Sequence, residues 1–149
     1  MIEIALIASD LPVHLLPDVT DRLHDRAGCL EARFSWHDQP PVLPVQWDGC
    51  LQLLQWGNHD RRSRLPVGAG LTRDQVAAGI VAGCHEAIIP ASMGRESGTW
   101  FLIEVGIRGV VVERGRTPLV YVLFEPSTNY YRNMTGQSPL MPVLVDQTI

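Results

Sequence analysis

The sequence predicts a domain of the α+β class that is built mainly from antiparallel β-structure. Short apolar runs of strand length recur along the chain, turn-forming residues separate them, and two segments have the pattern of a helix. With 149 residues, 46% of them hydrophobic and 19% charged, the chain is long enough for one globular core. We therefore expect residues 1–149 to form a single domain, a compact sheet or barrel with two or three short helices.

The first half of the chain predicts strands around one helix. Residues 16–28 predict this helix, because acidic residues come early in the segment, arginines come late and Gly28 ends it. Asp48 and Gly49 predict a two-residue hairpin turn. The strands expected in this half are residues 2–8, 31–36, 41–47 and 50–56.

The second half predicts a loop, one more helix and a run of strands. After Trp56 the sequence is polar and rich in glycine and arginine, which indicates a surface loop up to residue 70. Thr72 and Gln75 form a capping box at the start of a helix that we expect to end near Gly83. A long connection with room for a helical turn precedes the last strand. The strands expected here are residues 85–90, 99–105, 107–113, 118–124 and 141–146.

Composition narrows the classes of function. The formal net charge of −4 gives no general reason to expect nucleic acid. All 12 basic residues are arginine, which excludes lysine Schiff-base chemistry and favours planar recognition of carboxylate or phosphate. Three widely spaced cysteines suggest neither a disulfide framework nor a zinc site. No apolar stretch approaches transmembrane length, so we expect no membrane partner and a cytoplasmic location.

Histidines and serines give no specific signal. His37, His59 and His85 each precede an acidic residue, but adjacent residues on a strand point to opposite faces and no metal-binding spacing is present. We interpret them as surface histidines. Ser92 and Ser97 lack the strained turn of a serine nucleophile, and no glycine-rich dinucleotide motif is present. We therefore expect no metal and no cofactor.

Two short segments are more informative. Three arginines between residues 61 and 64 could grip a phosphate backbone, and nearby tryptophans could stack on bases; the alternative is a solvated loop over a tryptophan-containing core. In "CHEAIIPASMGRESGTW", residues 84–100, a turn-prone stretch carries Glu96 beside Arg95. A buried Glu96 could act as a general acid or base, whereas pairing with Arg95 would keep it ionised. A capping or salt-bridging role in a loop stays open.

The order of these pieces resembles the SOS-response-associated peptidase (SRAP) family of abasic-site DNA–protein crosslinkers. The matching segments are "ARFSWHDQPPVLPV" (32–45), "LLQWG" (53–57), "AIIPASMGRES" (87–97) and "LMPVLV" (140–145), the third of which aligns with the family motif "CLVPADGFYEW". The resemblance spans nearly the whole chain. It implies an SRAP-like fold, and it puts Glu96 at the position of the family's catalytic carboxylate.

The sequence departs from the family at its other essential positions. Ile2 stands where the family has its nucleophilic cysteine, Ser138 stands at the position of the catalytic histidine, and "VGAGLT" (67–72) replaces "NARAET". Because the thiol is missing, the thiazolidine crosslink cannot be carried over. We therefore expect an SRAP-like domain that binds single-stranded or abasic DNA non-covalently, with Glu96 as the candidate catalytic residue. The residues assigned to nucleic-acid binding are Arg61, Arg62, Arg64, Asn58, Trp56 and Arg95.

Two other functions remain open. The first is an enzyme that acts on a small molecule in a repurposed SRAP-like cleft near Glu96, with Glu96 as general acid or base and Ser138, His85 or Tyr130 nearby. The second is a protein-interaction module without chemistry. A closed apolar pocket around Glu96 would favour the enzyme, an open basic groove would favour DNA, and an exposed apolar patch would favour the interaction module.

Overall fold

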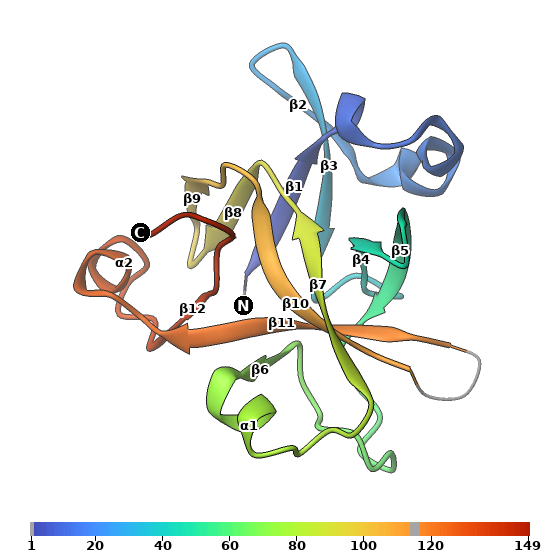
Figure 1. Ribbon diagram of the computed structural model, residues 1–149. Helices are drawn as coiled ribbons and strands as arrows, with labels where there is room; N and C mark the ends of the chain where they lie inside the picture. The colour runs from blue at the N-terminus through green and yellow to red at the C-terminus, as the bar shows by residue number, and fades with distance from the viewer. Residues whose placement is uncertain (1, 114–116) are drawn as a thin grey trace.

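The structure of the protein, a computed structural model, describes residues 2–113 and 117–149 and has the predicted α+β class (Figure 1). Two sheets, both largely antiparallel, make up most of it. Two short α-helices and two 3-10 helices connect the strands in the described part of the chain. These are η1 (Ala8–Asp10), η2 (Val13–Arg22), α1 (Arg73–Ala77) and α2 (Asn129–Met134).

The first sheet has the order β2-β3-β1-β8-β9 and occupies the upper part of the view in Figure 1. Its strand β8 pairs with β1 in the register Glu3↔Arg95 and Ile4↔Gly94, which brings the start of the chain beside residues 93–96. The strands of this sheet are β1 (Glu3–Ile7), β2 (Leu23–Arg26), β3 (Cys29–Ser35), β8 (Met93–Glu96) and β9 (Thr99–Leu102).

The second sheet curls into a ring. Its order is β10-β7-β4-β5-β11-β12, and β11 also pairs with β10, so that β10, β7, β4, β5 and β11 close on themselves. The short β6 and the end of β5 both run parallel to β11. The strands are β4 (Val42–Trp47), β5 (Cys50–Trp56), β6 (Gly70–Thr72), β7 (Cys84–Pro90), β10 (Gly106–Val112), β11 (Leu119–Pro126) and β12 (Leu140–Pro142).

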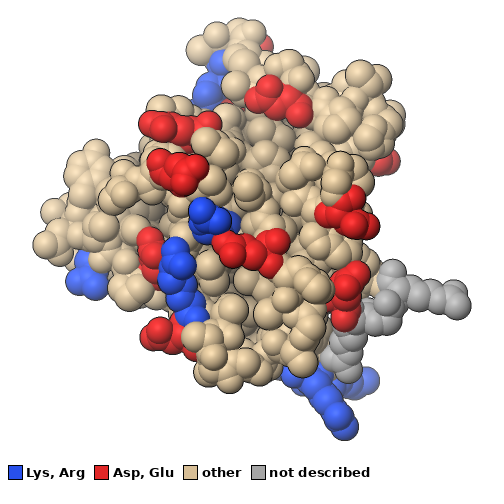
Figure 2. Space-filling model, in the orientation of Figure 1, with Lys and Arg blue, Asp and Glu red and all other residues tan. Residues whose placement is uncertain are grey.

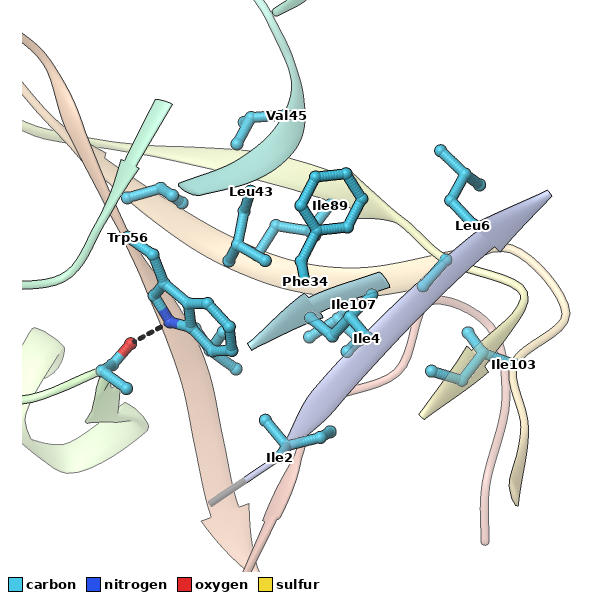
Figure 3. Packing of buried hydrophobic residues seen from close by; sticks show 14 of the residues in the cluster. Ile2, Ile4, Leu6, Phe34, Leu43, Val45, Trp56, Ile89, Ile103 and Ile107 are labelled. Atoms are coloured by element: carbon cyan, nitrogen blue, oxygen red, sulfur yellow. Dashed lines mark hydrogen bonds between the residues drawn. The ribbon is translucent and has the colours of Figure 1, made fainter. Parts of the chain in front are cut away.

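One hydrophobic cluster takes side chains from both sheets (Figure 3). Ile4 and Phe34 of the first sheet and Ile107 of the second are fully buried in it. Each such side chain contributes about 1.5–3 kcal/mol relative to leaving it exposed. Ile2 is 1% exposed and belongs to the same cluster, so the second residue of the chain serves the core.

The helix predicted for residues 16–28 is wrong. The 3-10 helix η2 ends at Arg22, and residues 23–26 form strand β2, which pairs with β3 across a turn at Ala27 and Gly28. Pro17 lies inside η2, and a proline has no backbone N–H to donate to a regular α-helix. Ala27 and Gly28 both have positive φ, which suits a tight hairpin turn and not a helix end.

The predicted helix after Thr72 begins as expected but ends early. The Thr72 side chain accepts a hydrogen bond from the Gln75 backbone N–H, and the Gln75 side chain accepts one from the Thr72 N–H, which confirms the capping box. The helix α1 then stops at Ala77, and Gly79 follows with a φ of 70°. Glycine at positive φ is the usual way to end a helix, so the helix ends well before Gly83.

The segment that carries Glu96 is a strand and not a loop. Residues 93–96 form β8, and a hairpin turn at Ser97 and Gly98, both at positive φ, leads into β9. The hairpin predicted at Asp48 and Gly49 is confirmed, with β4 and β5 on either side. The last strand is shorter than predicted and ends at Pro142.

Candidate functional site

The arginine loop, which we define as residues 57–69 between β5 and β6, presents Arg61, Arg62 and Arg64 to solvent. Basic side chains protrude at the lower end of the molecule in Figure 2, where Figure 1 shows this segment. Among the described residues, these three arginines and Arg132 of α2 form no ion pair with a carboxylate. The arginines that do form one are Arg22, Arg26, Arg33, Arg73, Arg95 and Arg108.

Asn58 organises the arginine loop from inside. It is 4% exposed, and its side-chain amide donates to the carbonyl oxygens of Asp60 and Leu65 at 3.2 and 3.0 Å. Its side-chain oxygen accepts from the Asp60 backbone N–H at 3.0 Å, and its backbone forms a bridge with Gly68. The amide predicted to contact nucleic acid is therefore used to hold the loop in shape.

Trp56 lies in the core, so its ring offers no face to a base. It is fully buried, and its indole N–H donates to the Ala69 carbonyl oxygen at 3.0 Å (Figure 3). The aromatic surface beside the loop comes from Trp36 and His59 instead. Their ring centroids are 3.8 Å apart and the planes differ by 13°, so the two rings are stacked.

A hollow of about 410 Å³ adjoins this stacked pair, and we call it the Trp36 hollow. Trp36, His37, Pro40, Pro41 and His59 form most of its wall, and Asp38 and Gln39 complete it. His59 belongs both to the hollow and to the arginine loop. The structure therefore joins an aromatic recess to the arginine loop through His59.

Arg95 belongs to a different surface. Its guanidinium donates to the Glu3 carboxylate at 2.9 Å, and neighbouring residues on β8 point to opposite faces, so Arg95 and Glu96 diverge. The sequence suggested a pair between Arg95 and Glu96, but in the structure Arg95 pairs with Glu3. Arg95 also lies 5.6 Å from the centre of the Trp100 ring.

Arg26 and Arg33 complete this charged cluster on the first sheet. Their guanidinium carbons lie 4.2 and 5.1 Å from the centre of the Trp100 ring. Both donate to Glu31, a carboxylate whose side chain is only 4% exposed. Burial by itself would raise the pKa of Glu31, but the hydrogen bonds and charges of the two arginines outweigh it and lower that pKa below 4.5. Arg26, Arg33 and Arg95 are therefore each already paired with a carboxylate.

Glu96 lines a second hollow, which we call the Glu96 hollow. Its volume is about 230 Å³, and its other walls are Phe124, Ser138, Pro139 and Leu140. The structure thus brings Glu96 and Ser138 together, although they are far apart in the sequence. The wall is largely apolar, and none of the described arginines contributes to it.

Tyr131 of α2 lies behind this hollow. Gly94 and Glu96 share one face of β8, the Phe101 ring packs over Gly94, and Tyr131 meets Phe101 edge to face at 5.6 Å. Tyr131 is fully buried, and its hydroxyl has no hydrogen-bond partner among the described residues. Burial, and after it the nearby Glu96 carboxylate, raises the pKa of the Tyr131 phenol well above 10, so the phenol stays protonated at neutral pH.

The sequence pointed to Tyr130 and His85 and not to Tyr131. Tyr130 is 67% exposed, and His85 is at the start of β7 in a pair with Glu113 at 3.4 Å. The signal that separates the two tyrosines is the cap of α2. The Thr128 side chain accepts a hydrogen bond from the Tyr131 N–H, which fixes the helix so that Tyr131 faces the core.

The position of Ile2 bears on the chemistry of the Glu96 hollow. Glu3 pairs with Arg95, so continuing the register by one residue sets Ile2 opposite Glu96. The side chain at this position is a buried hydrocarbon and carries no nucleophile.

The start of the arginine loop and the Glu96 hollow meet β11 at different points. The Gly57 N–H donates to the Val120 carbonyl oxygen at 2.7 Å, whereas Phe124 lines the Glu96 hollow. Four residues of extended strand separate Val120 from Phe124, a span of about 13 Å. Gly57 at the start of the arginine loop and the hollow that contains Glu96 are therefore anchored at different points of β11.

Within residues 2–113 and 117–149, no group of three or more His, Cys, Asp or Glu side chains is arranged to hold a metal ion. In the same residues, no helix is long and apolar enough to cross a membrane. Comparison of the chain with protein-family models, with curated proteins and with solved structures gives no match.

Proposed function

We propose that this protein binds single-stranded DNA non-covalently through Arg61, Arg62 and Arg64 of the arginine loop. The observation that carries the proposal is the contrast between these arginines and six others. Those six are neutralised by carboxylates, whereas the three on the loop are exposed, have no carboxylate partner among the described residues and lie within four positions of the sequence.

Unpaired arginines suit phosphate binding because no existing ion pair has to break when phosphate arrives. The hydrogen bonds of Asn58 already order the loop, which lowers the entropy that binding would otherwise cost. Three phosphate contacts to a single strand predict a slope of about −2 when the logarithm of affinity is plotted against that of salt concentration. The net charge of −4 disfavours DNA binding elsewhere on the surface, so binding should be confined to the arginine loop and sensitive to salt.

The resemblance to the SRAP family supports the same class of ligand. It does not support the same chemistry, because a buried Ile2 stands at the position of the cysteine nucleophile. We therefore expect an oligonucleotide with an abasic site to bind without forming a covalent bond to the protein. A band that resists denaturation on a gel would contradict this part of the proposal.

The test is fluorescence anisotropy with a labelled oligothymidine, titrated at several salt concentrations. We expect a variant with Arg61, Arg62 and Arg64 all changed to Ala to lose binding together with its salt dependence. Arg132→Ala is the matched control, because Arg132 is exposed and has no ion-pair partner among the described residues but lies on α2. Equal affinity of the triple variant and the wild type would refute the proposal.

A second candidate function rests on the Glu96 hollow. Its largely apolar wall and its carboxylate fit a small-molecule enzyme in which Glu96 is a general acid or base. At about 230 Å³ the hollow is smaller than the roughly 300–1,000 Å³ typical of ligand pockets, so the substrate would be a compound of a few heavy atoms.

The test of this candidate is protein-observed NMR with small carbonyl compounds. Binding in the hollow should shift the signals of Phe124, Ser138 and Leu140, and Glu96→Gln should abolish any turnover of a bound compound. Binding elsewhere on the surface, or turnover that persists in Glu96→Gln, would exclude Glu96 as the acid or base.

A further inference from the structure

We infer that the Trp36 hollow holds one intact base of the bound strand. This inference rests on the proposed function and deepens it, because it names the part of the nucleotide that the protein recognises. It assigns the hollow to a planar base, in contrast to an abasic sugar.

The first reason is the geometry of the stacked pair. Trp36 and His59 are separated by 3.8 Å with nearly parallel planes, the arrangement in which a third flat ring can continue the stack. Trp36 also meets the buried Trp56 edge to face at 5.9 Å, so the core fixes the orientation of its ring. His59 is exposed, and its outer face is therefore open to a base.

The second reason is the wall of the hollow. Its volume of about 410 Å³ is within the range of small-molecule pockets, and aromatic and proline rings supply flat apolar surface for a base. Asp38 supplies a fixed polar edge, because its carboxylate accepts from the Ser35 N–H at 2.8 Å and pairs with Arg22. The hollow therefore combines stacking surface with a polar group held in one place.

The third reason is its place beside the arginine loop. His59 precedes Arg61 by two residues, and Asp60, which lies between them, accepts a hydrogen bond from the Arg62 backbone N–H at 2.9 Å. A strand whose phosphates lie on the three arginines passes the mouth of the hollow. A base turned towards the protein then reaches the stacked pair, while a sugar without a base offers it no flat ring.

The experiment compares an oligothymidine with an oligonucleotide of the same length in which every nucleotide is an abasic analogue. We expect wild-type protein to bind the abasic strand roughly 5- to 150-fold more weakly, the effect of losing one base stack. His59→Ala should lose most of this preference and keep the salt dependence. His14→Ala is the matched control, because His14 is also exposed but lies on η2.

The outcomes separate this inference from the proposed function. Equal binding of the two strands, with strong salt dependence, would overturn the base site and leave DNA binding by the arginines intact. Binding of neither strand at low salt would overturn both. Tighter binding of the abasic strand would also refute the inference, since it would mean that the hollow prefers a bare sugar.

Discussion

Glu31 provides the most informative test of how the first sheet is held together. Its carboxylate is 4% exposed and accepts hydrogen bonds from Arg26 and Arg33, each at 2.9 Å. Breaking a buried ion pair by removing one partner costs about 3–5 kcal/mol, because the remaining charge is left buried. The two arginine side chains are 32% and 29% exposed, so solvent screens part of this loss. Glutamine keeps one acceptor, and we expect Glu31→Gln to lower the free energy of unfolding by about 2–3 kcal/mol.

The assay is urea denaturation at neutral pH, with thermal unfolding beside it. The expected loss corresponds to a fall in melting temperature of about 4–12 °C for a chain of this size. Glu86→Gln is the control, because Glu86 pairs with an arginine, Arg108, but its side chain is 61% exposed. Such an exposed pair contributes less than about 1 kcal/mol to the free energy of unfolding. If both substitutions cost the same, the reasoning from burial is wrong.

The pH dependence of the same variant checks the cause. The folded-state pKa of Glu31 is lowered, so its contribution to stability is present above the unfolded-state pKa of about 4.5 and disappears as pH falls through the folded-state value. The difference in stability between wild type and Glu31→Gln should therefore shrink as the solution is acidified below about pH 4.5. A difference that stays constant or grows in acid would refute the electrostatic account.

Three further predictions concern the regions around the two hollows. Gly70→Ala should lower the free energy of unfolding by about 1–3 kcal/mol, because the added Cβ would lie 2.5 Å from the Val122 carbonyl oxygen and closer still to the Phe124 ring. An unchanged midpoint of urea denaturation would contradict this packing. Asn58→Ala should loosen the arginine loop, so that hydrogen exchange and proteolysis there become faster and affinity for single-stranded DNA falls; a loop as protected as in the wild type would show that other contacts order it. Tyr131→Phe should leave stability unchanged or raise it at neutral pH, because the hydroxyl is buried without a partner among the described residues, and it should remove part of the loss of stability of the wild type above about pH 10. A loss of more than about 1 kcal/mol at neutral pH would mean that the hydroxyl is hydrogen-bonded in the folded protein.

Local signals in the sequence predicted the elements that local interactions determine. The Asp48–Gly49 turn and the Thr72–Gln75 capping box both depend on residues within a few positions of each other, and both are present. Strand β8 was missed because its own residues are turn-prone: it pairs with the adjacent β9, but its other partner is β1, at the start of the sequence. A turn-prone composition gives no sign of a strand that is held in part by so distant a partner.

The candidate sites also divide into features that local sequence predicts and features that depend on distant contacts. The exposed arginines could be read from composition, since polar loops lie on the surface. The stacking of His59 on Trp36 could not, because it depends on how the arginine loop folds back onto the end of β3. Asn58 and Trp56 have the residue types of a nucleic-acid interface, yet burial commits both to the structure of the protein itself. Residue type alone does not tell a binding group from a structural one.

The ring of the second sheet has a consequence for how the chain folds. Strand β11 supplies partners to β5, β6, β10 and β12, and it comes from residues 119–126. Until this strand has joined, the edges of β5 and β10 remain open, and open edges are templates for pairing with other chains. On a ribosome, β4, β5, β7 and β10 would all be made before β11, so the ring cannot close until residues 119–126 have emerged. Chains cut short before β11 should therefore aggregate, although they contain most of the core residues.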